Sequence, residues 1–443
     1  MRVRRSMKPM LKKLVSILSA GLMIAALMSC AQEKKEEGPI TLHYWTHEDP
    51  ARTELETKLI AEFEKDNPNI KVERTTQGAA KLIELVQTAF AANQGPDIFN
   101  LSIEDEYSYV ANGRVAPVDP KAAGYADQAA IYDSYLPEIL NAVTKDGKVY
   151  GLPLEITNWC IYINKKIFRD AGLDPEKDYP KTWEDMVAVS EKLVIRDGDI
   201  LVRRGFDFRY PYYLVAFVPM VEQLGGQLIS DDGKTAIVGD EAWIKFLTFM
   251  RDWGPSGKNL GSPTYKSARN LFNKDNNDIA MATTGLYQQG RIRKDNPDFY
   301  NSGEWMVVPF PQFKNAVKEV PACYYGHFLM VNNDISKAKQ EAAWKLIGFL
   351  LKHGEDYLRE GGNIIQPTKA LLESQTLKDM PYSDVFINDM NKGHMVYYGA
   401  NSAELQTAIR SAVESVMLSG VAPEKALDSL RTTAQEILDE ENK

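Results

Sequence analysis

The sequence predicts an α/β protein built from two domains, and three observations lead to this prediction. Beyond residue 38, strand-like and helix-like segments alternate, which is the order of a parallel sheet with helical crossovers. The chain has 443 residues, more than a single compact core usually accommodates. Amphipathic helical patterns become more frequent toward the C-terminus.

Residues 1–29 are predicted to be a signal peptide. Six basic residues precede the apolar run Leu14–Met28, which is short for a membrane span and typical of a secretory signal. The run ends in "LMSC", residues 27–30, which resembles the lipobox of bacterial lipoproteins. We therefore expect cleavage before Cys30 and acylation of this cysteine with palmitate-type chains. The alternative is an ordinary secretory cleavage nearby.

Residues 30–38 are predicted to be a lipidated tether, because "AQEKKEEG" has high charge density and no apolar period. Two or more acyl chains hold a protein stably at a bilayer, so we expect it at the outer face of the cytoplasmic membrane, on the periplasmic or extracellular side. No other apolar run reaches 18 residues. The lipid anchor is therefore the only membrane contact that we expect.

The net charge argues against a nucleic-acid partner. The formal net charge is −9, and loss of residues 1–29 removes six basic residues and no acidic ones, which leaves −15. Nucleic-acid binding depends on neutralising phosphates with clustered basic residues. Besides Cys30 the chain has Cys160 and Cys323, and we expect both to be free and buried, since a large core does not need a disulfide.

Five segments carry the parallel-sheet prediction. The strands combine aromatic and β-branched residues or short apolar runs, and the helices place apolar residues at helical spacing, as in Leu82, Leu85, Val86 and Phe90. In order they are a strand at 39–47, a helix at 49–68, a strand at 69–75, a helix at 79–95 and a strand at 96–101.

Later segments are assigned in the same way. Asp146-Gly147 marks a turn before an extended run. Thr182 is a helix cap, and acidic residues follow it in the first turn. Strongly amphipathic helices are expected at 239–253 and 339–354, and the last 40 residues are mostly helical in pattern.

Eight motifs in order along about 300 residues resemble one known family. They are "LHYWTHED" with "LIAEFEKDNPNIKVE", "GPDIFNL", "KVYGLPLE", "YINKKIFRDAGLDP", "PKTWEDM", "QLGGQLIS", "DIAMATTGLY" and "SKAKQEAAWKLIGFLL". The sequence is similar to the extracellular solute-binding proteins of sugar ABC transporters, the maltose-binding-like family 1.

The resemblance implies a two-lobed periplasmic-binding-protein-like fold, in which each lobe is a mainly parallel sheet with flanking helices and a hinge joins the lobes. It implies a monomer without catalytic residues, cofactor or metal, which captures a carbohydrate, an oligosaccharide by preference, between the lobes and delivers it to ABC permease subunits driven by an ATPase. The expected boundaries are 39–153 with 286–334 for the N-terminal lobe, and 154–285 with 335–443 for the C-terminal lobe.

A sugar site needs carboxylates and amides for hydroxyl groups and aromatic faces for the rings. By resemblance, the first strand ends in polar contacts, a carboxylate follows "GLPL", and Tyr287 stands where a stacking aromatic is common. The ligand-binding residues expected on these grounds are Trp45, His47, Glu48, Ser102, Glu104, Glu155, Asn158, Trp159, Tyr212, Tyr287, Tyr325, His327 and Tyr398. Each has a structural alternative, as a packed or solvated side chain. Arg209 ends the basic run "VRRGFDFR", residues 202–209, for which contact with an acidic sugar is one alternative and a solvated hairpin is the favoured one.

His43 and His47 have the four-residue spacing of a helical metal pair, but they lie on and after a predicted strand, so they need not converge on one ion. No metal is therefore expected. Rival ligands are a polyamine, a sugar phosphate, or a ferric ion held by tyrosines such as Tyr397 and Tyr398. An exported carbohydrate-active enzyme, with Glu48 and Glu155 as acid and base, is a weaker alternative.

Overall fold

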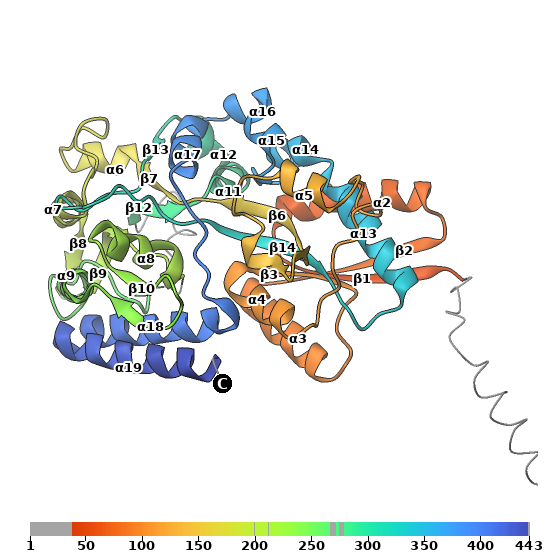
Figure 1. Cartoon of the computed structure of the whole chain (residues 1–443). Helices are drawn as coiled ribbons and strands as arrows, with labels where there is room; N and C mark the ends of the chain where they lie inside the picture. The colour runs from red at the N-terminus through yellow and green to blue at the C-terminus, as the bar shows by residue number, and fades with distance from the viewer. Residues whose placement is uncertain (1–37, 199, 211, 266–271, 274–278, 442–443) are drawn as a thin grey trace, which may run out of the picture. The chain divides into compact units, whose positions relative to one another are not determined.

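The structure is a computed structural model that describes residues 38–198, 200–210, 212–265, 272–273 and 279–441 (Figure 1). The predicted signal peptide, Cys30 and the tether up to residue 37 lie outside the described residues. Among the residues that are described, no helix has the length and apolarity needed to cross a membrane.

The first sheet has the strand order β2-β1-β3-β14-β6. β1 (Ile40–His47) pairs in parallel with β2 (Ile70–Gln77) and β3 (Ile98–Ser102), as predicted. β14 (Tyr325–Val331) is inserted antiparallel between β3 and β6 (Leu152–Thr157), so segments far apart in sequence lie side by side (Figure 1). The sheet is therefore mixed.

The crossover helices of this sheet form where their apolar stripes predict them. α2 (Pro50–Asp66) begins at Asp49, whose carboxylate accepts the backbone N–H of Arg52 at 3.2 Å, and Pro50 occupies the first turn, where it costs no hydrogen bond. α3 (Ala79–Ala91) buries Leu82, Val86 and Phe90. Both βα junctions lie at the carboxyl ends of strands β1 and β2, the edge where binding sites of such sheets form.

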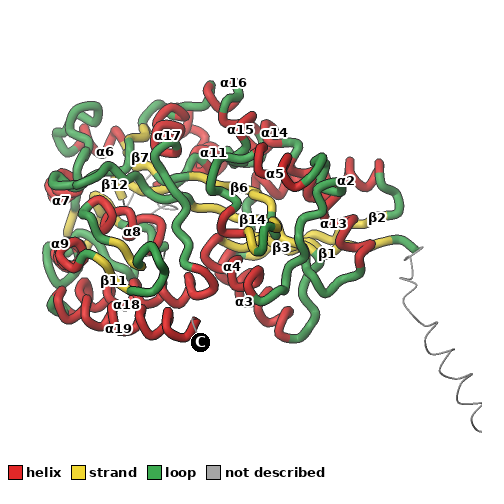
Figure 2. The backbone as a smooth tube through the Cα atoms, in the orientation of Figure 1, coloured by secondary structure: helices red, strands yellow, loops and turns green. Residues whose placement is uncertain are grey.

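The second sheet has the order β13-β7-β12-β9-β8. Its strands are β7 (Cys160–Asn164), β8 (Ile195–Asp197), β9 (Ile200–Asp207), β12 (Ile279–Thr284) and β13 (Trp305–Val308). β12 is parallel to β9 and antiparallel to β7. Helices flank the strands of both sheets (Figure 2), and two separate clusters of buried apolar side chains form the cores.

The remaining helices agree with the local signals. α7 (Trp183–Leu193) begins after Thr182, whose hydroxyl accepts the N–H of Asp185 at 3.1 Å. α9 (Asp240–Trp253) packs against the C-terminal helices α18 (Ser402–Ser419) and α19 (Pro423–Glu441). α8 (Tyr213–Gln223) is buried on nearly all sides. Cys160 and Cys323 are buried and free, as predicted.

Strand pairing and helix packing depart from the expected lobe boundaries at three places. β6 completes the first sheet although the expected boundary cuts it at residue 153, and β13 pairs with β7 in the second sheet although residues 286–334 were expected in the first lobe. α13 (Lys337–Leu351) packs against α2 and β1 rather than in the second lobe. Pairing between distant strands leaves no local pattern, which is why the sequence does not reveal these assignments.

Candidate functional site

Two adjoining cavities open at the carboxyl end of β1, with volumes of about 340 and 230 Å³. Both are lined by His47, Ala79, Tyr212, Tyr325 and His327. The larger cavity extends along β3 toward α4 (Ile103–Ala111) and α18. The smaller one extends toward β6 and the start of α11 (Tyr287–Asp295). Residues attached to both sheets therefore meet at one place.

His47 is held in one tautomer by Asn100. The backbone N–H of His47 donates to Asn100 Oδ1 at 3.2 Å, so the amide nitrogen of Asn100 faces the ring, where it lies 2.7 Å from Nδ1. The amide can only donate there, so Nδ1 accepts and Nε2 carries the proton. Burial, and secondarily His327, lowers the pKa of His47 well below its ordinary value. The ring is neutral and offers one N–H donor.

His327 stacks on His47. The ring centroids are 4.1 Å apart with an interplanar angle of 28°. The hydroxyl of Tyr325 lies 3.1 Å from His327 Nε2. Burial, and then Arg52, lowers the pKa of His327 to about 3, so this ring is also neutral near pH 7. The pair presents a flat polar surface without charge.

Glu155 lies beside the two histidines on β6, where it pairs with His327 across the sheet. The residue is 5% exposed, and its Oε1 has no hydrogen-bond partner among the described residues. Burial, followed by the nearby charge of Asp49, raises the pKa of the carboxyl group to about 7. A buried acceptor without a partner, on the wall of a cavity, is a ready contact for a ligand hydroxyl.

Gly326 allows β14 to approach β6 at this point. A Cβ atom at position 326 would lie 2.0 Å from the carbonyl oxygen of Glu155. No other residue type fits this gap without displacing the strands, so the glycine sets the spacing of the wall that carries Glu155 and His327.

His47, Glu155 and His327 also form a potential metal-ligand set, since one donor atom from each lies within 4.8 Å of the others. The donors do not fit that role. His47 Nδ1 is engaged by Asn100 and Nε2 is protonated, while metal binding needs a free lone pair.

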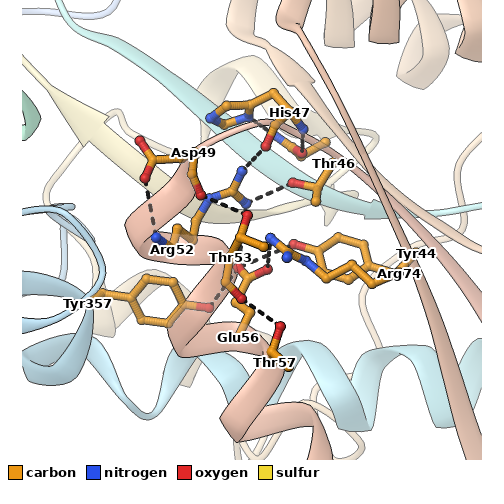
Figure 3. Close-up of polar contacts among 11 residues, drawn as sticks. Tyr44, Thr46, His47, Asp49, Arg52, Thr53, Glu56, Thr57, Arg74 and Tyr357 are labelled. Atoms are coloured by element: carbon orange, nitrogen blue, oxygen red, sulfur yellow. Dashed lines mark hydrogen bonds and ion pairs between the residues drawn. The ribbon is translucent and has the colours of Figure 1, made fainter. Parts of the chain in front are cut away.

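A buried ionic network lies beneath His47 (Figure 3). Arg52 donates to Thr46 Oγ1 at 2.7 Å and to the carbonyl oxygen of His47. It pairs with Glu56 at 3.4 Å, with both side chains fully buried. Glu56 also pairs with Arg74 at 2.8 Å and accepts the hydroxyl of Tyr357 at 3.0 Å. The network ties the end of β1 to α2, β2 and α14 (Gly354–Arg359).

Two arginines complete the smaller cavity. Arg291 donates to Asp49 at 3.1 Å and forms an ion pair with it. Arg209 donates to the hydroxyl of Tyr287. Its guanidinium carbon lies 4.7 Å from the ring centroids of Trp159 and Tyr212. Aromatic faces and a cation are thus placed on the side of the second sheet.

Nine of the thirteen predicted site residues line one or both cavities. They are His47, Glu48, Ser102, Glu104, Glu155, Tyr212, Tyr287, Tyr325 and His327. Glu104 lines the larger cavity, and burial raises the pKa of its carboxyl group to about 7.

Four predicted residues line neither cavity. Trp45 lies two residues before the strand end and packs against the first core. Asn158 and Trp159 are fully buried, and Trp159 acts as a support behind Arg209 and Tyr212. Tyr398 lines a separate surface cavity with Ser230 and Asp231. Trp45, Asn158 and Trp159 therefore contact the protein interior, whereas Tyr398 lies at a different place on the surface.

Several lining residues escaped the sequence prediction. Asn100 is the second-to-last residue of the motif "GPDIFNL", and a polar residue in an apolar strand is a signal that could have found it. Asp49 was expected only as part of a helix start, and it also holds Arg291. Arg291 and Arg410 lie on helices without any local sign of a site, so only the three-dimensional arrangement identifies them.

Comparison with known proteins gives the family. The family model described as "Bacterial extracellular solute-binding protein" matches residues 49–356. A binding protein of Brucella abortus is 24% identical over 356 residues, which cover 77% of this chain and 78% of that protein.

Solved structures agree in fold. A solute-binding protein of an ABC transporter from Thermotoga lettingae, bound with α-D-tagatose, has a TM-score of 0.78 at 21% identity and covers 90% of this chain and 100% of its own. The maltose/maltodextrin-binding domain MalE from Bdellovibrio bacteriovorus, bound to maltotriose, has a TM-score of 0.75 at 20% identity, with 90% and 99% covered.

Proposed function

The chain belongs to the bacterial extracellular solute-binding protein family, and from this premise we propose that it captures an oligosaccharide in the two adjoining cavities for uptake by an ABC importer. Proteins of this family are binding proteins rather than enzymes. The cavities therefore serve capture, and Glu48 and Glu155 need no role as acid and base.

One observation carries the proposal: fixed polar groups and aromatic faces line the same space. Glu155 offers an unpaired acceptor and His47 an N–H donor, and both suit sugar hydroxyls. Tyr212, Tyr287 and Tyr325 offer ring faces for the apolar side of a sugar. Two connected cavities of about 340 and 230 Å³ favour a ligand of more than one ring.

The proposed mechanism of capture is a shift in population. His47, Glu155 and His327 belong to the first sheet, whereas Arg209 and Tyr212 follow β9 of the second sheet. A ligand that contacts both groups stabilises the arrangement in which they face each other, by its difference in affinity between the closed and open states. This closed form is the one that we propose docks on the permease subunits.

The remaining parts of the proposal concern location. We place the protein at the outer face of the cytoplasmic membrane, as a monomer held by lipid on Cys30. Mass spectrometry of the mature N-terminus tests this directly, since acylation adds the mass of two or three chains to a peptide that begins at Cys30. A chain that begins elsewhere without lipid would contradict it.

A thermal-shift and calorimetry screen tests the ligand class. A ligand at 100 times its Kd adds about 2.7 kcal/mol to the stability. Mono- and oligosaccharides should raise the Tm of the wild type, and Glu155→Ala should abolish most of the shift, whereas Glu54→Ala on the exposed face of α2 should not. Shifts with spermidine or ferric ion but with no saccharide, neutral or charged, would overturn the assignment.

A further inference from the structure

Arg209 is the one arginine of the smaller cavity that has no carboxylate partner. Within the described part of the chain, no acidic group lies within 4.0 Å of its guanidinium, which donates a hydrogen bond to the hydroxyl of Tyr287. By contrast, Arg291 pairs with Asp49 in the same cavity, and Arg52 below the cavity floor pairs with Glu56.

The aromatic rings hold Arg209 in place but do not neutralise it. Its guanidinium lies 4.7 Å from the centroids of Trp159 and Tyr212, 5.6 Å from Tyr325 and 5.8 Å from Tyr287. Cation–π contacts attract a charge without supplying a counter-charge. A cation inside a protein cavity normally has an anionic partner, because removing it from water is costly.

The neighbouring groups do not provide that partner. His47 and His327 are neutral, and the Asp49 carboxylate is engaged by Arg291. Glu48 and Glu155 line the same cavity, and neither forms an ion pair with Arg209 among the described residues. The charge of Arg209 lowers the pKa of Glu155 only as a minor contribution, smaller than the effect of burial. A guanidinium presents N–H groups in a planar fork that matches the oxygens of a carboxylate, sulfate or phosphate group.

We propose that the preferred carbohydrate carries an anionic group, a carboxylate or a sulfate or phosphate ester, that pairs with Arg209 in the cavity. This inference rests on the proposed function, since it specifies the class of sugar. The same cavity supplies Glu155 and His47 for hydroxyl groups, so the anionic group adds one contact to a site that still recognises a sugar ring.

The test compares ligands that differ only in charge. Isothermal titration calorimetry is carried out with di- and trisaccharides of galacturonate, glucuronate and mannuronate, and with their neutral methyl esters. Because a hydrogen bond to a charged group contributes more than a neutral one, the acids should bind roughly 10- to 100-fold more tightly than their esters. Hexose 6-sulfates and 6-phosphates form separate arms that identify the type of anion.

Variants assign the preference to one side chain. Arg209→Gln should reduce the acid-to-ester ratio to less than about threefold, and Arg209→Lys should retain part of it, because a point charge replaces the fork. Arg196→Gln is the matched control, since Arg196 is exposed on the β8–β9 hairpin and donates to the backbone carbonyls of Lys258 and Asn259, outside both cavities. Circular dichroism verifies the fold of each variant.

The binding results distinguish failure of the inference about Arg209 from failure of the proposed function. Equal affinity for acids and esters in the wild type, or a preference that persists in Arg209→Gln, overturns the inference and leaves the carbohydrate function intact. Binding of neutral sugars without binding of any acidic sugar also overturns the inference and leaves the carbohydrate function intact. Failure of every saccharide to bind refutes the proposed function itself, and the inference falls with it.

Discussion

Replacing Glu155 by glutamine should stabilise the ligand-free protein at alkaline pH while it weakens carbohydrate binding. Burial raises the pKa of this carboxyl group from 4.5 to about 7. Below pH 4.5 the group is protonated in both the folded and unfolded states. As the pH rises toward 7, the unfolded chain ionises first, so the wild type loses stability until the folded state ionises too.

The pKa difference between the folded and unfolded states determines how much stability the wild type loses. The loss in unfolding free energy is about 3 kcal/mol at pH 8 and less than about 1 kcal/mol at pH 5. Glutamine has nearly the same shape and does not ionise, so Glu155→Gln should regain this free energy at pH 8. It should also bind an oligosaccharide about tenfold more weakly, because a charge-assisted hydrogen bond becomes a neutral one.

Urea unfolding at pH 5 and pH 8, followed by circular dichroism, measures the effect on stability, and calorimetry measures the effect on binding. Glu54→Gln is the control, because Glu54 is exposed on α2 and pairs with Lys294 at the surface. A stability difference between Glu155→Gln and the wild type that does not grow from pH 5 to pH 8 would refute the reasoning on burial.

Three further substitutions test the support of the site. Glu56→Ala leaves Arg52 and Arg74 without their carboxylate, so it should lower the free energy of unfolding in urea by about 3 to 5 kcal/mol. The control Glu54→Ala should lower it by less than about 1 kcal/mol. Similar losses for the two variants would contradict the stabilising role of the network. Asn100→Leu removes the amide that fixes the tautomer of His47, so ¹⁵N NMR of the ring should report a tautomer mixture and calorimetry a roughly tenfold loss of affinity. An unchanged ring spectrum would contradict the role of Asn100 in fixing the tautomer of His47. Gly326→Ala places a Cβ 2.0 Å from a carbonyl oxygen of β6 and should cost about 1 to 3 kcal/mol in thermal unfolding, so a wild-type Tm would show that the strands can separate freely.

Local signals explain which parts of the fold could be predicted. The strand–helix alternation up to residue 101 and the cap at Thr182 depend on nearest neighbours in sequence, and the structure confirms them. The insertion of β14 and the sheet membership of β13 depend on pairing across more than a hundred residues, for which single-sequence patterns carry no information.

The site residues, too, could be predicted where the signal is local and were missed where it depends on distant parts of the chain. His47 and Glu155 lie at or near strand ends where the resemblance places polar contacts, and both line the cavity. The sequence suggests Trp159 as a ligand contact near Glu155, but its side chain is fully buried and lines neither cavity. Arg291 was missed because its importance comes from Asp49, which is 242 positions away in the chain. A polar residue at a strand end can be recognised in the sequence as a candidate ligand contact, whereas its partners in space cannot.

The position of β14 has a consequence for the order in which the chain folds. β3 and β6 cannot complete their hydrogen bonding until residues 325–331 are available, because β14 lies between them. A chain that emerges N-terminus first therefore exposes two unpaired strand edges while about 170 residues of the intervening segment follow. Contacts of such long sequence separation slow folding. A truncation that ends before residue 325 should aggregate through these edges, and the intact chain should complete its first sheet and the wall that carries Glu155 and His327 only after β14 is available.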